Sequence, residues 1–522
     1  MALSKKTRIA LAAAPVLIFA AALPLLFCGT NGSPSRAEGV SDANVRPSAL
    51  AGSWYLKDPE ALRRRLGLYL ERAGKPKLGG RPLAIVSPHA GHLYAGQAMA
   101  YGFKALEGRD IRRVIVMGLT HRAPLSGVVV SGYSAYETPL GRVPLDRKAC
   151  EQLRLNPLFG DQPSVERDEH SIEIQLPFLQ AVLKEGFELV PILFGSLKDE
   201  EYAAAAKEIA KLVDDKTLVV ASSDFTHYGR RFDYAPFARD IPANIEALDR
   251  KAVDAILKKD RNAFDKHVRT TGATICGRVP IGVLLELLPK SARGTLLRYY
   301  RSADIGGAWD GSVSYADILF TEGDKASSFE GSELQRREAA MLNGAEQKEL
   351  LALARATVEA YVREKKAPDP ETLAKTVRAG LKKDMGVFVT LKERGELRGC
   401  IGSITGVEPL FRGVVRNAVN AAAFDPRFKP VAPEELKEIT VDVSVLSPPA
   451  PVKDAGDILP GWHGIVLQKA GRGATFLPQV AVEFGWDTDE LLGRLSSKAG
   501  LAEDAWKSGA EFEVYEAQIV SE

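Results

Sequence analysis

Four short apolar runs, separated by segments with helical spacing, most constrain the fold of residues 82 to about 320. Each run has the length of one buried strand. The segments between them are rich in Ala and Leu, as in residues 200–213. Strands that alternate with helices predict an α/β domain. The four runs cover residues 83–87, 113–119, 187–195 and 217–223.

A polar, charged segment at residues 322–344 has almost no apolar spacing, which is typical of a linker. A second unit follows over residues 345–522. It starts with a helical pattern at 345–366 and continues with two β runs around a glycine-containing turn at 385–404. Residues 439–449 alternate like a half-buried strand. The sequence therefore predicts a second domain of the α+β class.

The first 37 residues look like a targeting segment. Three basic residues within the first eight precede an apolar run at residues 9–28. This order predicts an export signal or a membrane anchor. Three routes stay open: cleavage after Ala37, lipidation at Cys28, or an uncleaved span. Each route places the rest of the chain, including residues 38–321, outside the cytoplasm, either in the periplasm or anchored to the membrane.

Charge and cysteine content exclude two classes of protein. The 69 Lys and Arg residues nearly balance the 67 Asp and Glu residues, giving a net charge of +2. A nucleic-acid protein usually carries a strongly basic face, so no nucleic-acid partner is expected. Four cysteines in 522 residues are too few for a disulfide framework.

Reactive side chains follow three of the four apolar runs. His89 comes after the first, His121 after the second, and Asp224 and His227 after the last. In open α/β sheets, ligands bind at the carboxyl ends of the strands. If the runs belong to one sheet, these side chains lie at one edge, which favours a shared site over separate structural histidines.

Cys276 is a further candidate because it directly precedes the helical run at residues 281–288. A helix N-terminus lowers a thiol pKa and favours the thiolate. Thiolate and imidazole together suit iron, copper or zinc rather than magnesium or calcium. The alternative is a small buried side chain, which is common for free cysteine.

A polar cluster at residues 167–173 precedes an apolar helix. Glu169 and Glu173 are four residues apart and share one helical face. One interpretation is a solvated helix start, where acids are favourable. The other is that His170 or Glu173 lines the same pocket as the strand-end histidines.

Residues 47 to about 320 resemble the Memo family. The resemblance implies a fold similar to the class III extradiol, non-haem iron dioxygenases. It also implies an iron or copper site with His89, His121 and Cys276 as ligands. The matching motifs are Gly-Ser-Trp-Tyr at 52–55, Pro-His-Ala-Gly at 88–91, Gly-Leu-Thr-His at 118–121, Glu-His-Ser-Ile-Glu at 169–173, Ser-Ser-Asp-Phe at 222–225 and Cys-Gly at 276–277.

The resemblance also places Asp224 and His227 in the pocket, and with His170 and Glu173 they are the candidate catalytic residues. A cysteine ligand differs from the two-histidine, one-carboxylate site of the dioxygenases, so their activity does not transfer. His92 stands where this family usually has an aromatic residue. It is interpreted as either an additional ligand or a polar wall of the pocket.

Residues 345–522 resemble the AMMECR-like family, and Arg398 and Cys400 are its candidate site residues. A thiol near an arginine favours a reactive thiolate, whereas the alternative is a tight turn that needs its glycines. The motifs that carry this resemblance are Leu-Arg-Gly-Cys-Ile-Gly at 397–402, Ala-Phe-Asp-Pro-Arg-Phe at 423–428, Val-Leu-Ser-Pro-Pro at 445–449 and Thr-Phe-Leu-Pro-Gln-Val at 475–480.

Together the two halves resemble the B-type and A-type proteins of the AmmeMemoRadiSam system, fused in one chain. That resemblance implies a radical S-adenosylmethionine protein as a partner. The expected function is a metal-dependent oxidoreductase or modification enzyme of unknown substrate. The alternative is a non-catalytic scaffold whose pocket binds a peptide or protein.

Overall fold

The computed structural model describes residues 44–306, 308–331 and 341–522. The predicted export signal or anchor at residues 1–37 lies outside these ranges. Within them, every helix is too short or too polar to cross a bilayer.

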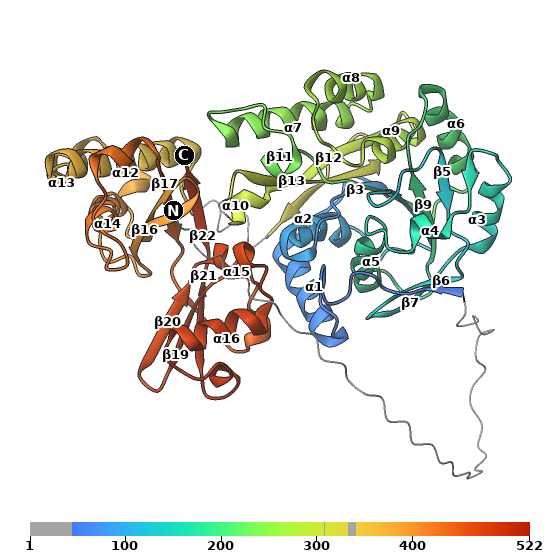
Figure 1. Ribbon diagram of the computed structural model, residues 1–522. Coiled ribbons are helices and arrows are strands. Elements are labelled where there is room, and N and C mark those ends of the chain that lie inside the picture. Colours follow the sequence, from blue (N-terminus) through green and yellow to red (C-terminus); the bar gives the residue numbers. More distant parts are fainter. Residues whose placement is uncertain (1–43, 307, 332–340) are drawn as a thin grey trace, which may run out of the picture. The chain divides into compact units, whose positions relative to one another are not determined.

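A nine-stranded sheet forms the centre of the first domain, drawn in blue to yellow-green in Figure 1. In spatial order it contains β11 (His227–Gly229), β13 (Gly311–Glu322), β3 (Pro82–Ser87), β10 (Thr217–Ser222), β4 (Arg113–Leu119), β9 (Glu188–Phe194), β5 (Val128–Val130) and β8 (Phe159–Gly160), with β12 (Ala292–Arg301) paired to β13.

The four middle strands, β3, β10, β4 and β9, are the predicted apolar runs, and all four predictions are confirmed. They run parallel to one another. Almost every residue in them is buried, which explains why they are continuously apolar rather than alternating. The outer strands β13 and β5 pair antiparallel with this core.

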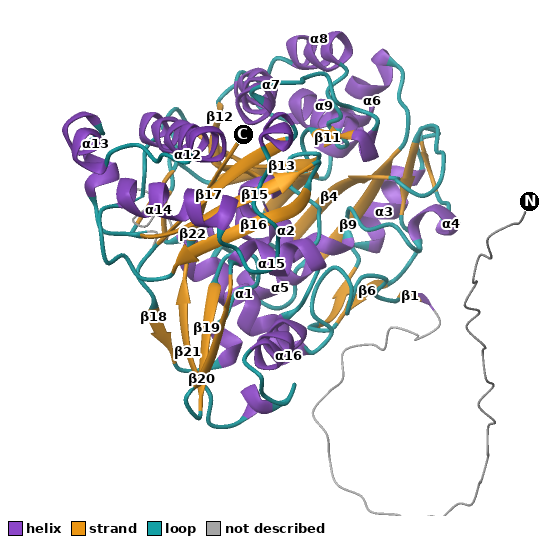
Figure 2. Cartoon of the chain, turned by 60° about the vertical axis from the view of Figure 1, so that its left-hand side comes forward, coloured by secondary structure: helices purple, strands orange, loops and turns teal. Residues whose placement is uncertain are grey.

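Helices lie outside the strands, as the purple ribbons of Figure 2 show. Two of them matter for the site, because α2 packs on β3 and β13, while α9 packs on β10 and β4. The helices of this domain are α1 (Pro59–Ala73), α2 (His92–Lys104), α3 (Arg147–Arg154), α4 (Pro163–Glu166), α5 (Leu176–Val182), α6 (Asp199–Ala210), α7 (Ile241–Leu257), α8 (Arg261–Thr271), α9 (Arg278–Leu287) and α10 (Ser302–Gly306).

A small three-stranded sheet holds the start of the described chain. Its strands are β1 (Val45–Arg46), β6 (Ala135–Thr138) and β7 (Gly141–Pro144).

The predicted linker differs from the structure at its start. Strand β14 (Ser328–Glu330) lies within it and pairs antiparallel with β2 (Lys75–Lys77). The reason is Phe329, which is buried and packs its ring 5.0 Å from that of Tyr101. One apolar side chain in a polar segment was too weak a signal for a strand. Residues 332–340 lie outside the described ranges.

The second domain contains two four-stranded sheets in which all pairings are antiparallel, which agrees with the predicted α+β class. One sheet has the order β16 (Glu396–Ser403), β15 (Gly386–Glu393), β17 (Ile439–Leu446) and β22 (Ala517–Ser521). The other has the order β18 (Ala450–Val452), β21 (Glu511–Tyr515), β19 (Gly464–Lys469) and β20 (Arg472–Phe476). Its helices are α12 (Gly344–Glu364), α13 (Pro370–Thr376), α14 (Leu410–Ala423), α15 (Pro478–Phe484) and α16 (Thr488–Lys498).

Candidate metal centre

The order of the central strands brings the candidate residues to one edge of the sheet. Strand β10 lies between β3 and β4, and the three strands are parallel. Their carboxyl ends therefore point the same way. His89 follows β3, His121 follows β4, and Asp224 follows β10 between them. Cys276 approaches from the turn before α9, the helix that packs on β10 and β4.

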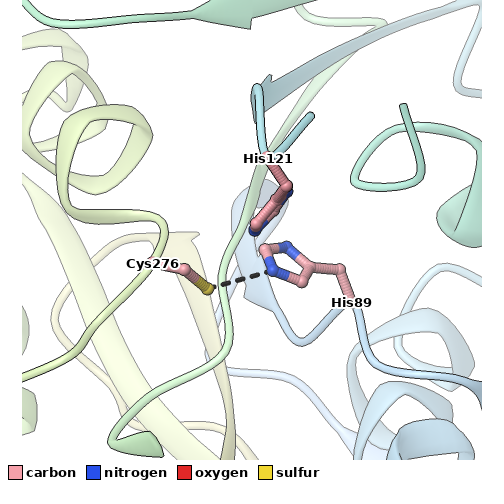
Figure 3. A group of neighbouring side chains, drawn as sticks. All are labelled: His89, His121 and Cys276. Atoms are coloured by element: carbon pink, nitrogen blue, oxygen red, sulfur yellow. Dashed lines mark hydrogen bonds between the residues drawn. The ribbon is translucent and has the colours of Figure 1, made fainter. Parts of the chain in front are cut away.

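Three of these side chains meet, as Figure 3 shows. The candidate ligand atoms of His89, His121 and Cys276 all lie within 4.8 Å of one another. The Cys276 sulfur is 3.0 Å from Nε2 of His89. The two imidazole rings are nearly perpendicular, with centroids 5.1 Å apart. The structure thus brings together the three residues that the Memo resemblance named as ligands.

The His89 ring is oriented by a serine at the end of β10. Its Nδ1 lies 3.0 Å from the hydroxyl of Ser222, which leaves Nε2 to face Cys276. Burial and the neighbouring imidazoles hold the pKa of His89 well below its usual value. The ring is therefore neutral and presents a lone pair rather than a charge.

His121 is oriented by a carboxylate. Its Nδ1 donates to Oε1 of Glu169 over 3.0 Å, and its backbone N–H donates to Oε2 over 2.6 Å. Burial raises the pKa of Glu169, but the hydrogen bond from His121 and the neighbouring imidazole of His170 outweigh it and lower that pKa to about 2. A carboxylate that stays ionised fixes the Nδ1 proton of His121, so its Nε2 is the free ligand atom.

Asp224 and His227 stand beside the three ligands. Oδ1 of Asp224 accepts the backbone N–H of His89 over 2.7 Å. Nδ1 of His227 donates to the carbonyl oxygens of Phe225 and Thr274. Burial raises the pKa of Asp224, an effect that the charge of His227 partly opposes.

Cys276 reaches its position because a glycine follows it. The N–H of Gly277 donates to the Ser223 hydroxyl over 3.0 Å. A Cβ at position 277 would lie 2.2 Å from that of Ser223, so only glycine fits there without a shift. Burial and the charge of Asp224 raise the pKa of the Cys276 thiol well above its usual value. The metal-free protein therefore holds a thiol at this position, not the thiolate that the helix N-terminus predicted.

His170 borders both candidate histidine ligands, and its ring centroid is 5.3 Å from that of His89. Its ring centroid is 4.2 Å from that of His121 and 4.4 Å from that of Trp54. Burial and the neighbouring imidazole of His121 lower the pKa of His170 to about 4. His170 therefore lines the pocket as a neutral imidazole, and its catalytic role stays a prediction.

His92 and Glu173 have partners in other parts of the core. His92 packs between Tyr55 and Phe178, and its Nε2 lies 3.1 Å from the carbonyl oxygen of Ile174. Glu173 forms a buried salt bridge of 2.6 Å with Arg46. It also accepts hydrogen bonds from Ser48, Tyr55 and the backbone at 49 and 50. Through these contacts Glu173 holds residues 46–55 against the core, which is a structural role. None of its contacts supports the predicted catalytic role.

The sequence interpretation missed Glu169, Ser222 and Gln175. Glu169 entered it only as a helical neighbour of Glu173. Gln175 donates from Nε2 to the carbonyl of Pro88 and to Ser222. The sequence feature that could have pointed to Glu169 is the Glu-His-Ser-Ile-Glu motif, whose polar residues are buried in the structure.

Comparison with known proteins agrees with this geometry. The family model described as "Memo-like protein" matches residues 46–319. The chain belongs to the Memo-like family. A second family model, AMMECR1, matches residues 351–520.

The curated relatives each match about half of the chain. Protein memo-1 homolog of Caenorhabditis elegans is 36% identical over 293 residues, which are 53% of this chain and 83% of that protein. Protein MEMO1 of Homo sapiens is 33% identical over 285 residues, which are 52% of this chain and 95% of that protein. The solved structure of an uncharacterised protein from Pyrococcus horikoshii is 34% identical, with a TM-score of 0.33, and covers 34% of this chain and 92% of its own.

In the AMMECR1 domain, Cys400 has other neighbours than expected. Arg398 is turned toward Glu435 and the carbonyl of Lys429. Arg427 is the arginine near Cys400, because its Nη2 donates to the Cys400 carbonyl over 3.0 Å. The thiol itself accepts from Thr390 over 3.2 Å. Burial raises the pKa of Cys400, which favours the unreactive thiol over the reactive thiolate.

Cys400 should therefore react slowly with iodoacetamide at pH 7. Its rate should rise about tenfold per pH unit up to pH 9, because only the thiolate attacks. Peptide mapping by mass spectrometry separates Cys400 from Cys150, a buried control whose pKa burial raises to about 12. A Cys400 rate at pH 7 equal to that at pH 9 would indicate a thiolate and contradict this assignment.

Replacing Gly277 with alanine should disturb the position of Cys276. Overpacking against Ser223 should lower the free energy of unfolding by about 1–3 kcal/mol, as measured by urea denaturation. Gly67 in α1 is the matched control, since nothing lies within 4 Å of the Cβ it would gain. Gly67→Ala should be neutral or slightly stabilising. Equal changes in the free energy of unfolding for the two variants would argue against the close approach of residues 277 and 223.

Glu173→Gln should lower the free energy of unfolding by about 3–5 kcal/mol, because it leaves the buried guanidinium of Arg46 without its anion. The control is Glu151→Gln, which removes an exposed ion pair with Arg147 and should cost less than about 0.5 kcal/mol. Urea midpoints of the two variants test this, and a Glu173→Gln protein as stable as the control would refute a structural role for Glu173.

Proposed function

We infer that the Memo-like domain binds a redox-active transition metal, iron or copper, through His89, His121 and Cys276. The domain then uses the metal in redox or modification chemistry on a substrate not yet identified. The observation that carries this proposal is the convergence of the three ligand atoms within 4.8 Å of one another.

The donor set supports such an ion. Imidazole nitrogen and cysteine sulfur are the ligands that iron, copper and zinc prefer. Both Nδ1 atoms already have oxygen partners, in Ser222 and Glu169. Both Nε2 atoms are therefore available without a change of tautomer, as in most protein metal sites.

Asp224 and His227 are suited to move protons beside the ion. The imidazole of His227 is a group that can both accept and donate a proton. The carboxyl of Asp224, whose pKa burial raises, is the second candidate. An imidazole and a carboxyl in one pocket are side chains that general acid–base catalysis uses.

A bound iron or copper ion would supply one-electron redox chemistry and would polarise an oxygen atom of the substrate. Three protein ligands are typical of catalytic sites, whereas structural sites usually have four. The side chain of His121 is 28% exposed, so solvent reaches the site on that side. These features favour catalysis over the alternative of a non-catalytic binding scaffold.

Metal analysis of the purified protein tests this function. The wild type, loaded with iron or copper and then desalted, should retain one ion per chain. His121→Ala and Cys276→Ser should each lower retention at least tenfold, because each removes one of three ligands. His267→Ala is the matched control, since this histidine lies in α8 and bonds the carbonyl of Leu248. Wild-type retention in both site variants would refute the centre.

Azide distinguishes catalysis from a closed site. In a centre with an open position, azide should bind the loaded protein and change its visible spectrum. An unchanged spectrum at saturating azide, with the ion retained, would favour the scaffold function.

A further inference from the structure

One short segment, residues 169–175, forms hydrogen bonds with His121 directly and with His89 through Ser222. Segment 169–175 runs beneath the ends of β4 and β10 and is buried throughout. Its residues form hydrogen bonds with the last residue of each strand, Leu119 of β4 and Ser222 of β10. The Ser171 hydroxyl accepts the N–H of Leu119 and donates to its carbonyl, which fastens the segment to the end of β4.

The contact with His121 is direct. Oε1 of Glu169 accepts from Nδ1 of His121, and Oε2 accepts from its backbone N–H. Oε1 also accepts the backbone N–H groups of His170 and Ser171, over 2.8 and 2.9 Å. The carboxylate is thus held by four donors in all, three of them rigid backbone groups, and its side chain is 1% exposed.

The contact with His89 runs through Ser222. The Ser222 hydroxyl lies 2.5 Å from the carbonyl oxygen of Ser171, 3.1 Å from Nε2 of Gln175 and 3.0 Å from Nδ1 of His89. A hydroxyl has a single proton. The carbonyl can only accept and the amide can only donate, so the Ser222 proton points to Ser171. Nδ1 of His89 must then donate to Ser222, which leaves Nε2 unprotonated.

We propose that segment 169–175 is a positioning element that sets the tautomer of both histidine ligands, His121 through Glu169 and His89 through Ser222. This inference deepens the proposed function and rests on it. Glu169 and Ser222 are positioning residues, because neither one takes a place among the three ligands.

A second metal ion bound by His121, Glu169 and His170 is the competing interpretation, because their candidate ligand atoms also lie within 4.8 Å of one another. The contacts of Glu169 argue against it. A cation at Oε1 would face two backbone N–H groups whose positive ends already point at that oxygen. It would also have to displace the Nδ1 proton of His121. One ion per chain is therefore expected.

Histidine tautomers in the metal-free protein test the element without any metal. Long-range ¹H–¹⁵N spectra of protein labelled at histidine nitrogens identify the protonated nitrogen of each ring, with single-histidine variants for assignment. The wild type should show Nδ1–H at both His89 and His121. Glu169→Gln should change the signals of His121 and leave those of His89 unchanged, whereas Ser222→Ala should change those of His89 and leave those of His121 unchanged. A wild-type ring protonated at Nε2, at either position, would overturn the proposal.

Affinity for Co²⁺ provides the second readout, with Co²⁺ alone as the probe. Loss of an outer partner of a ligand typically weakens metal affinity about 10–100-fold, and both variants should show that loss. The thiolate-to-cobalt absorption band should persist, because Cys276 is untouched. Ser222→Thr, which keeps the hydroxyl, should restore the affinity.

Glu166→Gln is the matched control for Glu169→Gln. Glu166 is a buried carboxyl three residues away that accepts from the Tyr136 hydroxyl, and burial raises its pKa, so the amide is a close mimic. This variant should bind Co²⁺ like the wild type. Equal affinities of Glu169→Gln and Glu166→Gln, or two ions per chain, would overturn the proposal. A wild type that binds no metal but shows both Nδ1–H tautomers would overturn the proposed function alone.

Discussion

The site depends on three adjacent parallel strands, β3, β10 and β4. Neighbouring strands lie about 4.8 Å apart. Side chains that follow three adjacent strands in register are therefore close enough to reach one ion together. The carboxyl ends of parallel strands also lie at the same edge of the sheet, where the residues that follow the strands can bind a ligand. The histidines at positions 89 and 121 and the carboxylate at 224 therefore converge as a result of topology, and only the sulfur of Cys276 has to be brought in from elsewhere. Gly277 makes that approach sterically feasible.

Topology places the ligand residues, but hydrogen bonds decide which atom of each ring faces the site. A neutral imidazole can present either nitrogen, and the two tautomers are close in energy when nothing selects between them. Here each Nδ1 proton has a buried oxygen partner. An unpaired polar group in that position would cost about 1–3 kcal/mol. Because turning either ring would leave its Nδ1 proton unpaired, the oxygen atoms of Ser222 and Glu169 fix the orientation of the two imidazoles.

Most of the fold could be predicted from the sequence, because buried parallel strands leave an apolar signature that needs no knowledge of distant residues. The four central strands and the long helices of both domains carry this local signal. The edge strand at 328–330 does not, because a single phenylalanine stabilises it.

The site was predictable only in part, for a related reason. The candidate ligands His89 and His121 follow strands and Cys276 precedes a helix, all of which are visible in the sequence, and the Memo resemblance implied the three residues as ligands. Glu169 and Ser222 act through hydrogen bonds that link positions 48 and 133 residues apart, and no pattern of spacing reports such a bond. For Glu173, by contrast, the sequence suggested a place in the pocket. It belongs to the same motif as Glu169, but its partners are Arg46 and residues 48–55.

The raised pKa of Cys276 fits a metal ligand better than it fits a nucleophile. A nucleophilic cysteine needs its thiolate stabilised before the substrate arrives, usually by a cation or a helix N-terminus. In this pocket the thiol instead lies 3.0 Å from Nε2 of His89 and donates to the carbonyl oxygen of Asp224 over 3.4 Å. The Nε2 lone pair of His89 is the same one that a metal ion would use. Proton and metal therefore compete for one pair of donor atoms, sulfur and nitrogen. Binding of an ion would release the thiol proton, whereas the hydrogen bonds of both Nδ1 atoms, to Ser222 and to Glu169, do not depend on it. The candidate ligand atoms for such an exchange lie within 4.8 Å of one another in the metal-free protein.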